Sequence, residues 1–166
     1  SFKEYDMKNR FFNMNLAGGA LLDIGVYALS IVRSFMTEKP ADIVSQWKPS
    51  PAGSDEQAAI LLKNKDGQMA TVALSLHSKQ PKRAMISLEK GYIEIMEYPR
   101  ADRAKIVDAS TGEKKEISCG KTEDALFYEM TDMERAVESG DETEMYLNYT
   151  KDVMDIMTGL RREWGL

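Results

Sequence analysis

Residues 16–27 read LAGGALLDIGVY and give the clearest structural signal in the chain of 166 residues. Apolar side chains recur from residue 20 to residue 35 at steps of three and four, which is the spacing of one helix face. Gly18 and Gly19 precede this run, and glycines at such a position permit a sharp turn and a close approach of the backbone to a ligand. Pro40 ends the unit, because the residue before a proline disfavours helical geometry. The stretch predicts a helix over residues 20–35 that begins after a Gly-Gly turn.

Two polar side chains interrupt this apolar helix. Asp23 and Tyr27 are four residues apart, so that they project from one face of the helix, one turn apart. Ser30 and Ser34 continue the same stripe. The stripe is either the solvent side of an ordinary surface helix or a polar line inside an otherwise buried helix, and periodicity alone leaves both interpretations open.

A series of short extended runs follows the helix, linked by turn residues. The turns at residues 65–67, 89–91 and 110–112 each end in glycine, and they predict three hairpins. The predicted strands cover residues 42–48, 57–63, 68–78, 83–88, 92–97, 104–108 and 115–118.

Two helices close the chain. The first is expected from a cap at Thr122 to a stop at Gly140, with a stripe of Leu126, Met130, Met133 and Val137. The methionines of the two helices are expected in the core: Met130, Met133, Met154 and Met157. The second has a predicted buried face of Val153, Ile156, Met157, Leu160 and Trp164. The element order predicts an α+β fold, with an open-faced, mainly antiparallel or mixed sheet of about seven strands and helices packed on one face. There is no G-x-G-x-x-G or P-loop pattern, so we expect no Rossmann domain in this chain.

Composition excludes several classes of protein. The formal net charge of −5 argues against a nucleic-acid binder, which normally carries a basic surface. The apolar stretch at residues 16–32 is interrupted by Asp23 and three glycines, so we expect no membrane span. The polar residues 1–10 do not resemble a signal peptide. Cys119 is the one cysteine, which predicts a cytoplasmic setting without an intramolecular disulfide.

The chain resembles the Gfo/Idh/MocA oxidoreductases, in the branch of dihydrodiol dehydrogenases, xylose dehydrogenases and glucose-fructose oxidoreductase. The resemblance rests on the run GGALLDIGVY, on the RFFN that precedes it at residues 10–13, and on the closing LRREWGL at residues 160–166. It implies that residues 1–166 form a single substrate-side and oligomerisation domain of a larger two-domain enzyme. The other half would be an N-terminal Rossmann domain that binds NAD or NADP, so that we expect no cofactor on this chain itself.

The resemblance also implies roles for individual residues. The catalytic side chains of the family signature correspond to Asp23 and Tyr27, while the family's catalytic lysine belongs to an E-K-P motif in the Rossmann domain. A tyrosine needs a neighbouring cation to exchange protons near neutral pH. In the family the proton-transfer role is given to the lysine or to the tyrosine, and the assignment between them is open here.

Four further positions are candidates for contact with cofactor or substrate. They are Arg10 and Asn13, which precede the signature, and Gly18 and Gly19 within it. For Arg10 the alternative is an ion pair with a surface acid. Residues 38–40 also spell E-K-P, but they follow the signature helix, so we do not expect Lys39 to be catalytic. His77 is expected to be exposed or satisfied in the core, and we expect no metal site.

Two functions are compatible with these features. The first is hydride transfer between NAD(P) and a secondary alcohol or carbonyl of a sugar, polyol or cyclic diol, with the isolated chain inactive. The second is a non-catalytic binding or dimerisation module that uses the open sheet. Residues 57–63 are apolar on both faces, and Met69, Thr71 and Ala73 add only weakly polar side chains, which predicts a homodimer or higher oligomer through the sheet.

Overall fold

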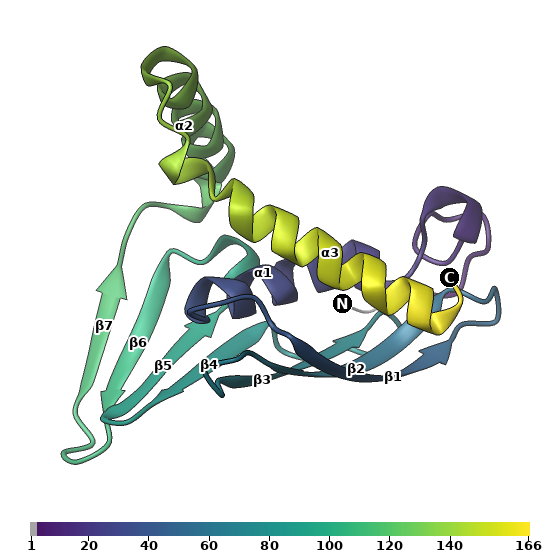
Figure 1. Ribbon diagram of the computed structural model, residues 1–166, viewed down its shortest axis with the longest axis horizontal. Helices are drawn as coiled ribbons and strands as arrows, with labels where there is room; N and C mark the ends of the chain where they lie inside the picture. The colour runs from purple at the N-terminus through teal and green to yellow at the C-terminus, as the bar shows by residue number, and fades with distance from the viewer. Residues whose placement is uncertain (1–2) are drawn as a thin grey trace. The chain divides into compact units, whose positions relative to one another are not determined.

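The computed structural model describes residues 3–166, which belong to two compact units. One unit consists of the chain up to Gln80 together with Asn148–Leu166, and the other of Pro81–Leu147. Each unit has its own antiparallel sheet (Figure 1). The number of strands and their antiparallel pairing confirm the predicted α+β class, but the seven strands form two hydrogen-bonded sheets of three and four rather than the single sheet that was predicted.

The first unit contains the sheet β1–β2–β3, made of β1 (Asp42–Pro49), β2 (Asp55–Lys63) and β3 (Met69–Ser75). Side chains alternate across this sheet, as the period of a strand requires. Ile60 and Leu62 are buried on one face, whereas Val44 and Leu61 are exposed on the other. The predicted open face is therefore confirmed for this unit.

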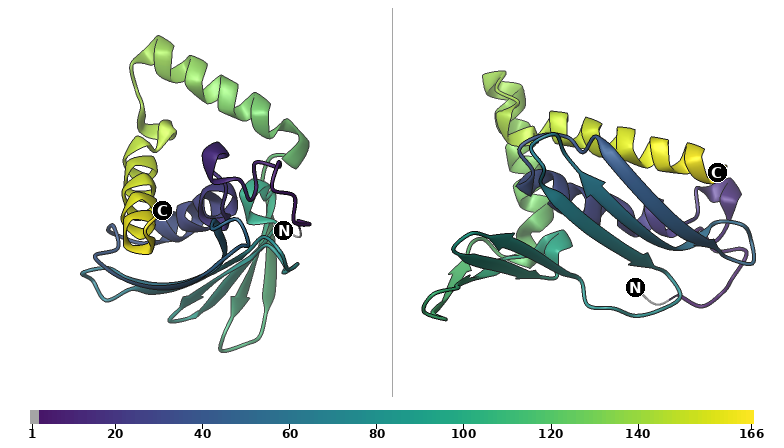
Figure 2. Two further views of the ribbon diagram at one scale, coloured as in Figure 1. Left: turned by 90° about the vertical axis from the view of Figure 1, so that its right-hand side faces the viewer. Right: turned by 60° about the horizontal axis from the view of Figure 1, so that its bottom comes forward.

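The covered face of β1–β2–β3 packs against helices of the same unit (Figures 1 and 2). All five residues of the predicted stripe on α3 (Leu147–Trp164) are buried, which confirms that prediction: Val153, Ile156, Met157, Leu160 and Trp164. The Trp164 indole stacks on Trp47 of β1 at a centroid distance of 5.6 Å, and its Nε1 donates a hydrogen bond to Ser45 Oγ at 2.8 Å.

The predicted helix over residues 20–35 begins in an unexpected geometry. Leu21–Gly25 forms a π-helix, and α1 (Val26–Phe35) continues from it as an α-helix. A Cβ atom at Gly25 would lie 3.0 Å from Leu74 Cδ1 of β3, so glycine permits the close contact between this helix and the sheet. Single turns of π-helix are rare in proteins, and those that occur are often found at functional sites.

The segment Met14–Phe35 is long and apolar enough to cross a membrane by length and composition alone. Core helices of globular proteins meet the same criterion. Here Leu21, Ala28 and Leu29 are buried within the unit, and α1 contacts β3. Part of the segment therefore belongs to the core of this unit.

The second unit contains the sheet β4–β5–β6–β7 and the helix α2 (Ala125–Ser139). The strands are β4 (Arg83–Leu88), β5 (Gly91–Met96), β6 (Arg103–Asp108) and β7 (Lys114–Ser118). Two predictions about α2 are wrong. Thr122 does not cap it, because α2 begins at Ala125 with Asp124 as its N-cap residue. The stripe with the two methionines expected in the core is exposed: Leu126, Met130, Met133 and Val137. Met154 of α3, which was also expected in the core, is exposed as well. The helix does end at Gly140, which has a left-handed φ of 72°.

Candidate functional site

The signature begins with a tight turn that the chain's own backbone holds together. The Gly18 N–H donates to Asn13 O at 2.9 Å, and the Gly19 N–H donates to Phe11 O at 3.0 Å. A Cβ atom at Gly18 would lie 2.8 Å from three backbone atoms of Arg10 and Asn13. Glycine at this position is therefore required by the turn itself, and contact of either glycine with a ligand stays a prediction.

The turn brings Arg10 to Asp23. Arg10 Nη2 lies 3.0 Å from Asp23 Oδ1, and the Arg10 guanidinium also lies over the Phe11 ring. The Asp23 side chain is 15% exposed and that of Arg10 is 64% exposed, so that the carboxylate is largely enclosed while its cation faces solvent. Two residues that were named separately as candidates are thus joined in one ion pair.

Tyr27 lies one residue into α1 and is 49% exposed. Because Asp23 lies within the π-helix and Tyr27 lies within α1, the regular α-helical spacing assumed for Asp23 and Tyr27 does not hold over that interval. Asn13 stabilises the turn, since its side-chain oxygen accepts from the Asn15 N–H at 2.9 Å. A catalytic role for Tyr27 and a ligand contact for Asn13 stay predictions.

The residue that sequence reasoning missed is Asp55. Its Oδ2 accepts a hydrogen bond from the Leu21 N–H at 2.6 Å, at the start of the signature helix, and the residue is 2% exposed. Burial raises the pKa of Asp55 to about 6, although backbone N–H donors and the Arg161 guanidinium act in the opposite direction. One signal could have indicated it: Asp55 and Glu56 are two acids that open an otherwise apolar run.

The helix that follows the Gly-Gly turn does not fit a dinucleotide phosphate. Helix N-termini bind phosphates through their free N–H groups. Here the Asp55 carboxylate already accepts the Leu21 N–H, and its negative charge would repel a second anion. This position therefore offers no pyrophosphate site.

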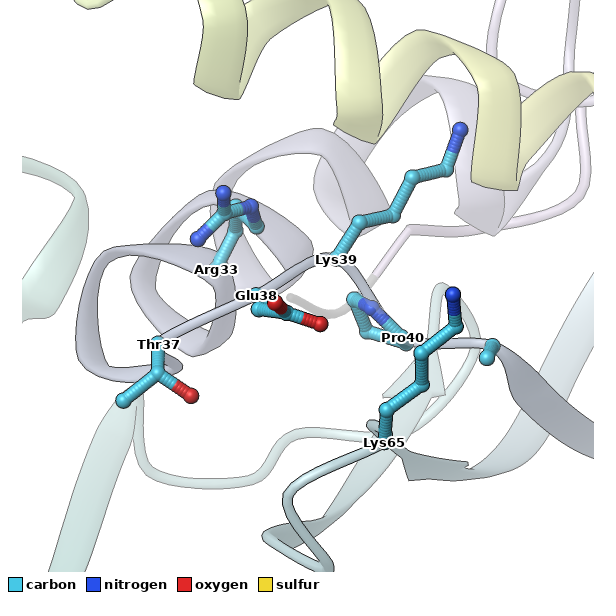
Figure 3. Close-up of a pocket in the computed structure, with 7 residues that line it drawn as sticks. Arg33, Thr37, Glu38, Lys39, Pro40 and Lys65 are labelled. Atoms are coloured by element: carbon cyan, nitrogen blue, oxygen red, sulfur yellow. The ribbon is translucent and has the colours of Figure 1, made fainter.

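The E-K-P sequence at residues 38–40 lines an open pocket of about 520 Å³ together with Arg33, Thr37 and Lys65 (Figure 3). Lys39 Nζ lies 2.7 Å from Asp155 of α3. Arg33 is also bound to α3, through a 2.7 Å contact between its Nε and Asp152 Oδ2. Arg33 thus joins α3 to α1, and Lys39 joins α3 to the loop after α1. That Lys39 is not catalytic stays a prediction.

His77 and Cys119 lie outside the signature. His77 Nδ1 lies 2.9 Å from Lys3 O and its ring stacks on Tyr5, as expected for a satisfied histidine. Cys119 is exposed. Within residues 3–166, no group of three or more His, Cys, Asp or Glu side chains is placed to hold a metal ion.

The chain is similar to known oxidoreductases over much of its length. The family model for the GFO/IDH/MocA C-terminal domain matches residues 1–94, which is more than half of the chain. A trans-1,2-dihydrobenzene-1,2-diol dehydrogenase from Mus musculus is 31% identical over 87 residues, and one from Xenopus laevis is 30% identical over 100 residues. These matches cover 52% and 60% of this chain but only 26% and 30% of the relatives.

Solved structures share the fold. An aldose-aldose oxidoreductase from Caulobacter crescentus superposes with a TM-score of 0.75 at 20% identity, covering 98% of this chain and 51% of that protein. A 3-ketoreductase from Actinomadura kijaniata, solved with NADP and TDP-benzene, gives a TM-score of 0.78 at 14% identity, covering 97% of this chain and 50% of that protein. The chain thus spans about half the length of these structures.

Proposed function

This chain belongs to the Gfo/Idh/MocA family as a C-terminal domain, and from that membership we propose that it is the substrate-side half of an NAD(P)-dependent oxidoreductase. The reaction is hydride transfer between the nicotinamide and a secondary alcohol or carbonyl of a sugar, polyol or cyclic diol. A nucleotide-binding domain outside this chain holds the cofactor. The observation that carries the proposal is the enclosed Asp23 carboxylate, held by Arg10 on the helix that also bears Tyr27.

The chain's own residues handle the proton and the orientation of the substrate. When an alcohol is oxidised, its carbon gives up a hydride and its hydroxyl gives up a proton as the carbonyl forms. The bound nicotinamide supplies the hydride acceptor. The phenol oxygen of Tyr27 exchanges the hydroxyl proton, or passes it on when a lysine of the other domain takes that role, and general acid–base catalysis of this kind contributes about 10²–10⁴ in rate.

Asp23 and Arg10 orient the substrate. A carboxylate accepts hydrogen bonds from hydroxyl groups, and vicinal hydroxyls are what sugars, polyols and cyclic diols share. Because Arg10 already contacts Asp23 Oδ1, one carboxylate oxygen is held in place while Oδ2 has acceptor capacity for a substrate hydroxyl or for a lysine of the partner domain.

The experiment uses the two-domain protein, in which this chain is joined to its nucleotide-binding domain. Aldoses, polyols and cyclic trans-diols are supplied with NAD⁺ and with NADP⁺, and the reduced nicotinamide is followed by absorbance. We expect turnover with at least one class of diol-bearing substrate and none with the isolated chain. The absence of turnover across all classes and both cofactors, in a protein that binds the dinucleotide, would refute the proposal.

A non-catalytic assembly module is the second candidate, and the open face of β1–β2–β3 favours it. Val44 and Leu61 are Cα partners on β1 and on the central strand β2, and Met69 is exposed nearby on β3. Contiguous apolar surface of this kind commonly marks a contact. A homodimer through this face is compatible with catalysis as well, so dimerisation without turnover is the result that would favour the assembly module.

A further inference from the structure

A β-bulge decides where Asp55 points. In the register of β1 with β2, Lys48 is opposite Gln57 and Pro49 is opposite Asp55, so that Glu56 is the extra residue and is opposite no residue of β1. Along a regular strand Asp55 would share the exposed face with Ala59 and Leu61. The extra residue reverses the alternation and turns Asp55 to the covered face, and bulges near functional sites commonly re-aim a side chain in this way.

The two adjacent acids consequently have separate partners. Glu56 Oε1 lies 3.1 Å from Lys48 Nζ, and Glu56 Oε2 accepts a hydrogen bond from the Tyr5 hydroxyl. Asp55 instead accepts from the Leu21 N–H, 34 residues earlier in the chain. Ala20, at the N-cap position of the π-helix, provides no side-chain cap of its own. Asp55 therefore caps this helix from a neighbouring strand.

The same carboxylate requires glycine in the turn. A Cβ atom at Gly19 would lie 1.9 Å from Asp55 Oδ1, and Gly19 has a φ of +133°, which other residues rarely adopt. Gly19 O in turn accepts a hydrogen bond from the Asp23 N–H at 3.1 Å. A short path of contacts thus runs from Asp55 through Gly19 to the backbone of Asp23.

We propose that Asp55 is the positioning residue of this site: from β2 it fixes the start of the signature helix and thereby sets where Asp23 meets Arg10. The consequence for catalysis rests on the proposed function, whereas the structural effect does not. The acid is suited to the position because a carboxylate at a helix N-terminus is stabilised by the helix dipole. Arg161 of α3 is the cation that acts on it electrostatically from another element.

Amide hydrogen exchange on the chain itself tests the structural effect. In Asp55→Ala we expect the Leu21 and Asp23 amides to exchange roughly 3- to 30-fold faster, which corresponds to the loss of a helix cap. The Ile60 and Leu62 amides in β2 report global opening and should change much less. Asp55→Asn keeps an acceptor oxygen and should restore most of the protection, and Asp42→Ala, an exposed acid on β1, should have no effect. Unchanged Leu21 exchange in Asp55→Ala would overturn the proposal.

A measurement on the unmodified chain covers the case in which Asp55→Ala does not fold. The Leu21 amide proton, followed by NMR from pH 4 to pH 8, should shift with a midpoint near 6, the pKa that burial gives Asp55. Asp55→Asn should abolish this transition. A Leu21 amide that does not respond to pH in this range would contradict the proposal.

Kinetics of the two-domain protein test the consequence for the site. Misplacing reacting groups by about 1 Å lowers turnover by up to about 10²-fold. We expect Asp55→Ala to lower kcat on this scale with little change in KM, and Asp55→Asn to recover it. A two-domain protein without any activity would refute the proposed function and leave the exchange result standing, whereas normal kcat together with altered exchange would show that Asp55 does not position the reacting groups.

Discussion

The guanidinium of Arg10 contacts the carboxylate of Asp23, with 3.0 Å between Nη2 and Oδ1, and so joins the segment before the Gly-Gly turn to the helix after it. Solvent-exposed ion pairs contribute about 0–1 kcal/mol to stability, so the value of this contact for folding is small. Its value for the site is that it orients an enclosed carboxylate.

Replacing Arg10 should therefore affect turnover more than stability. For Arg10→Ala in the two-domain protein we expect a change of less than about 1 kcal/mol in the free energy of unfolding. We expect a fall of roughly tenfold or more in kcat/KM, because Asp23 loses its fixed orientation. Lys8→Ala, an exposed cation in the same segment, is the control. Equal kcat/KM values for Arg10→Ala and Lys8→Ala would show that Arg10 has no role in turnover.

The buried carboxylate of Asp55 makes stability depend on pH. Its pKa in the folded chain is about 6, above the value of about 3.9 for an unfolded aspartate. Folding therefore favours the protonated form, so this contribution to stability is full below pH 4 and is lost as the pH rises through 6. Relative to wild type, Asp55→Asn should gain up to ~3 kcal/mol between pH 4 and pH 7, measured by urea unfolding. A difference that does not vary with pH would contradict the pKa, and Asp42→Asn should show no such trend.

The isolated chain should bind neither NAD(H) nor NADP(H) with useful affinity. The one Gly-Gly helix start is capped by Asp55, so its N–H groups are not free for a phosphate. Calorimetry with each dinucleotide tests this expectation, and the two-domain protein serves as the positive control. Micromolar binding to the isolated chain would mean that a nucleotide site exists within it.

Self-association through β1–β2–β3 is the fourth expectation. Leu61 lies at the centre of the open face, between Val44 on β1 and Thr71 on β3. Light scattering across a dilution series should give twice the chain mass of 18.7 kDa, and Leu61→Arg should shift the protein toward the monomer. Met154→Arg, on the exposed side of α3, is the matched control. A mass of 18.7 kDa at high concentration would leave this face to another partner.

The sequence predicted elements whose patterns are local. The buried stripe of α3 followed from helical periodicity, and the strands of both sheets followed from alternation and glycine turns. The stripe of α2 has the same periodicity but is exposed. The prediction failed because a period indicates which residues share a face and does not indicate whether another element covers that face.

The sequence predicted three residues of the candidate site, but neither Asp55 nor the contacts that join these residues. Asp23, Tyr27 and Arg10 lie within one short segment, so a motif could indicate them. The contact between Asp55 and Leu21 depends on a bulge at Glu56 and on a partner 34 residues away, and no local pattern encodes either. The π-helix at Leu21–Gly25 likewise has no local signal, although Gly25 permits its close contact with Leu74 of β3.

The exchange of the substrate proton by Tyr27 is the central claim, and one comparison tests it most directly. Initial rates of the two-domain protein are measured for Tyr27→Phe and for Ser34→Ala, an exposed side chain further along the same helix. The account predicts that Tyr27→Phe lowers kcat by about 10²–10⁴ with little change in KM, while Ser34→Ala matches wild type. Wild-type kcat in Tyr27→Phe would contradict it and leave the proton transfer to another group.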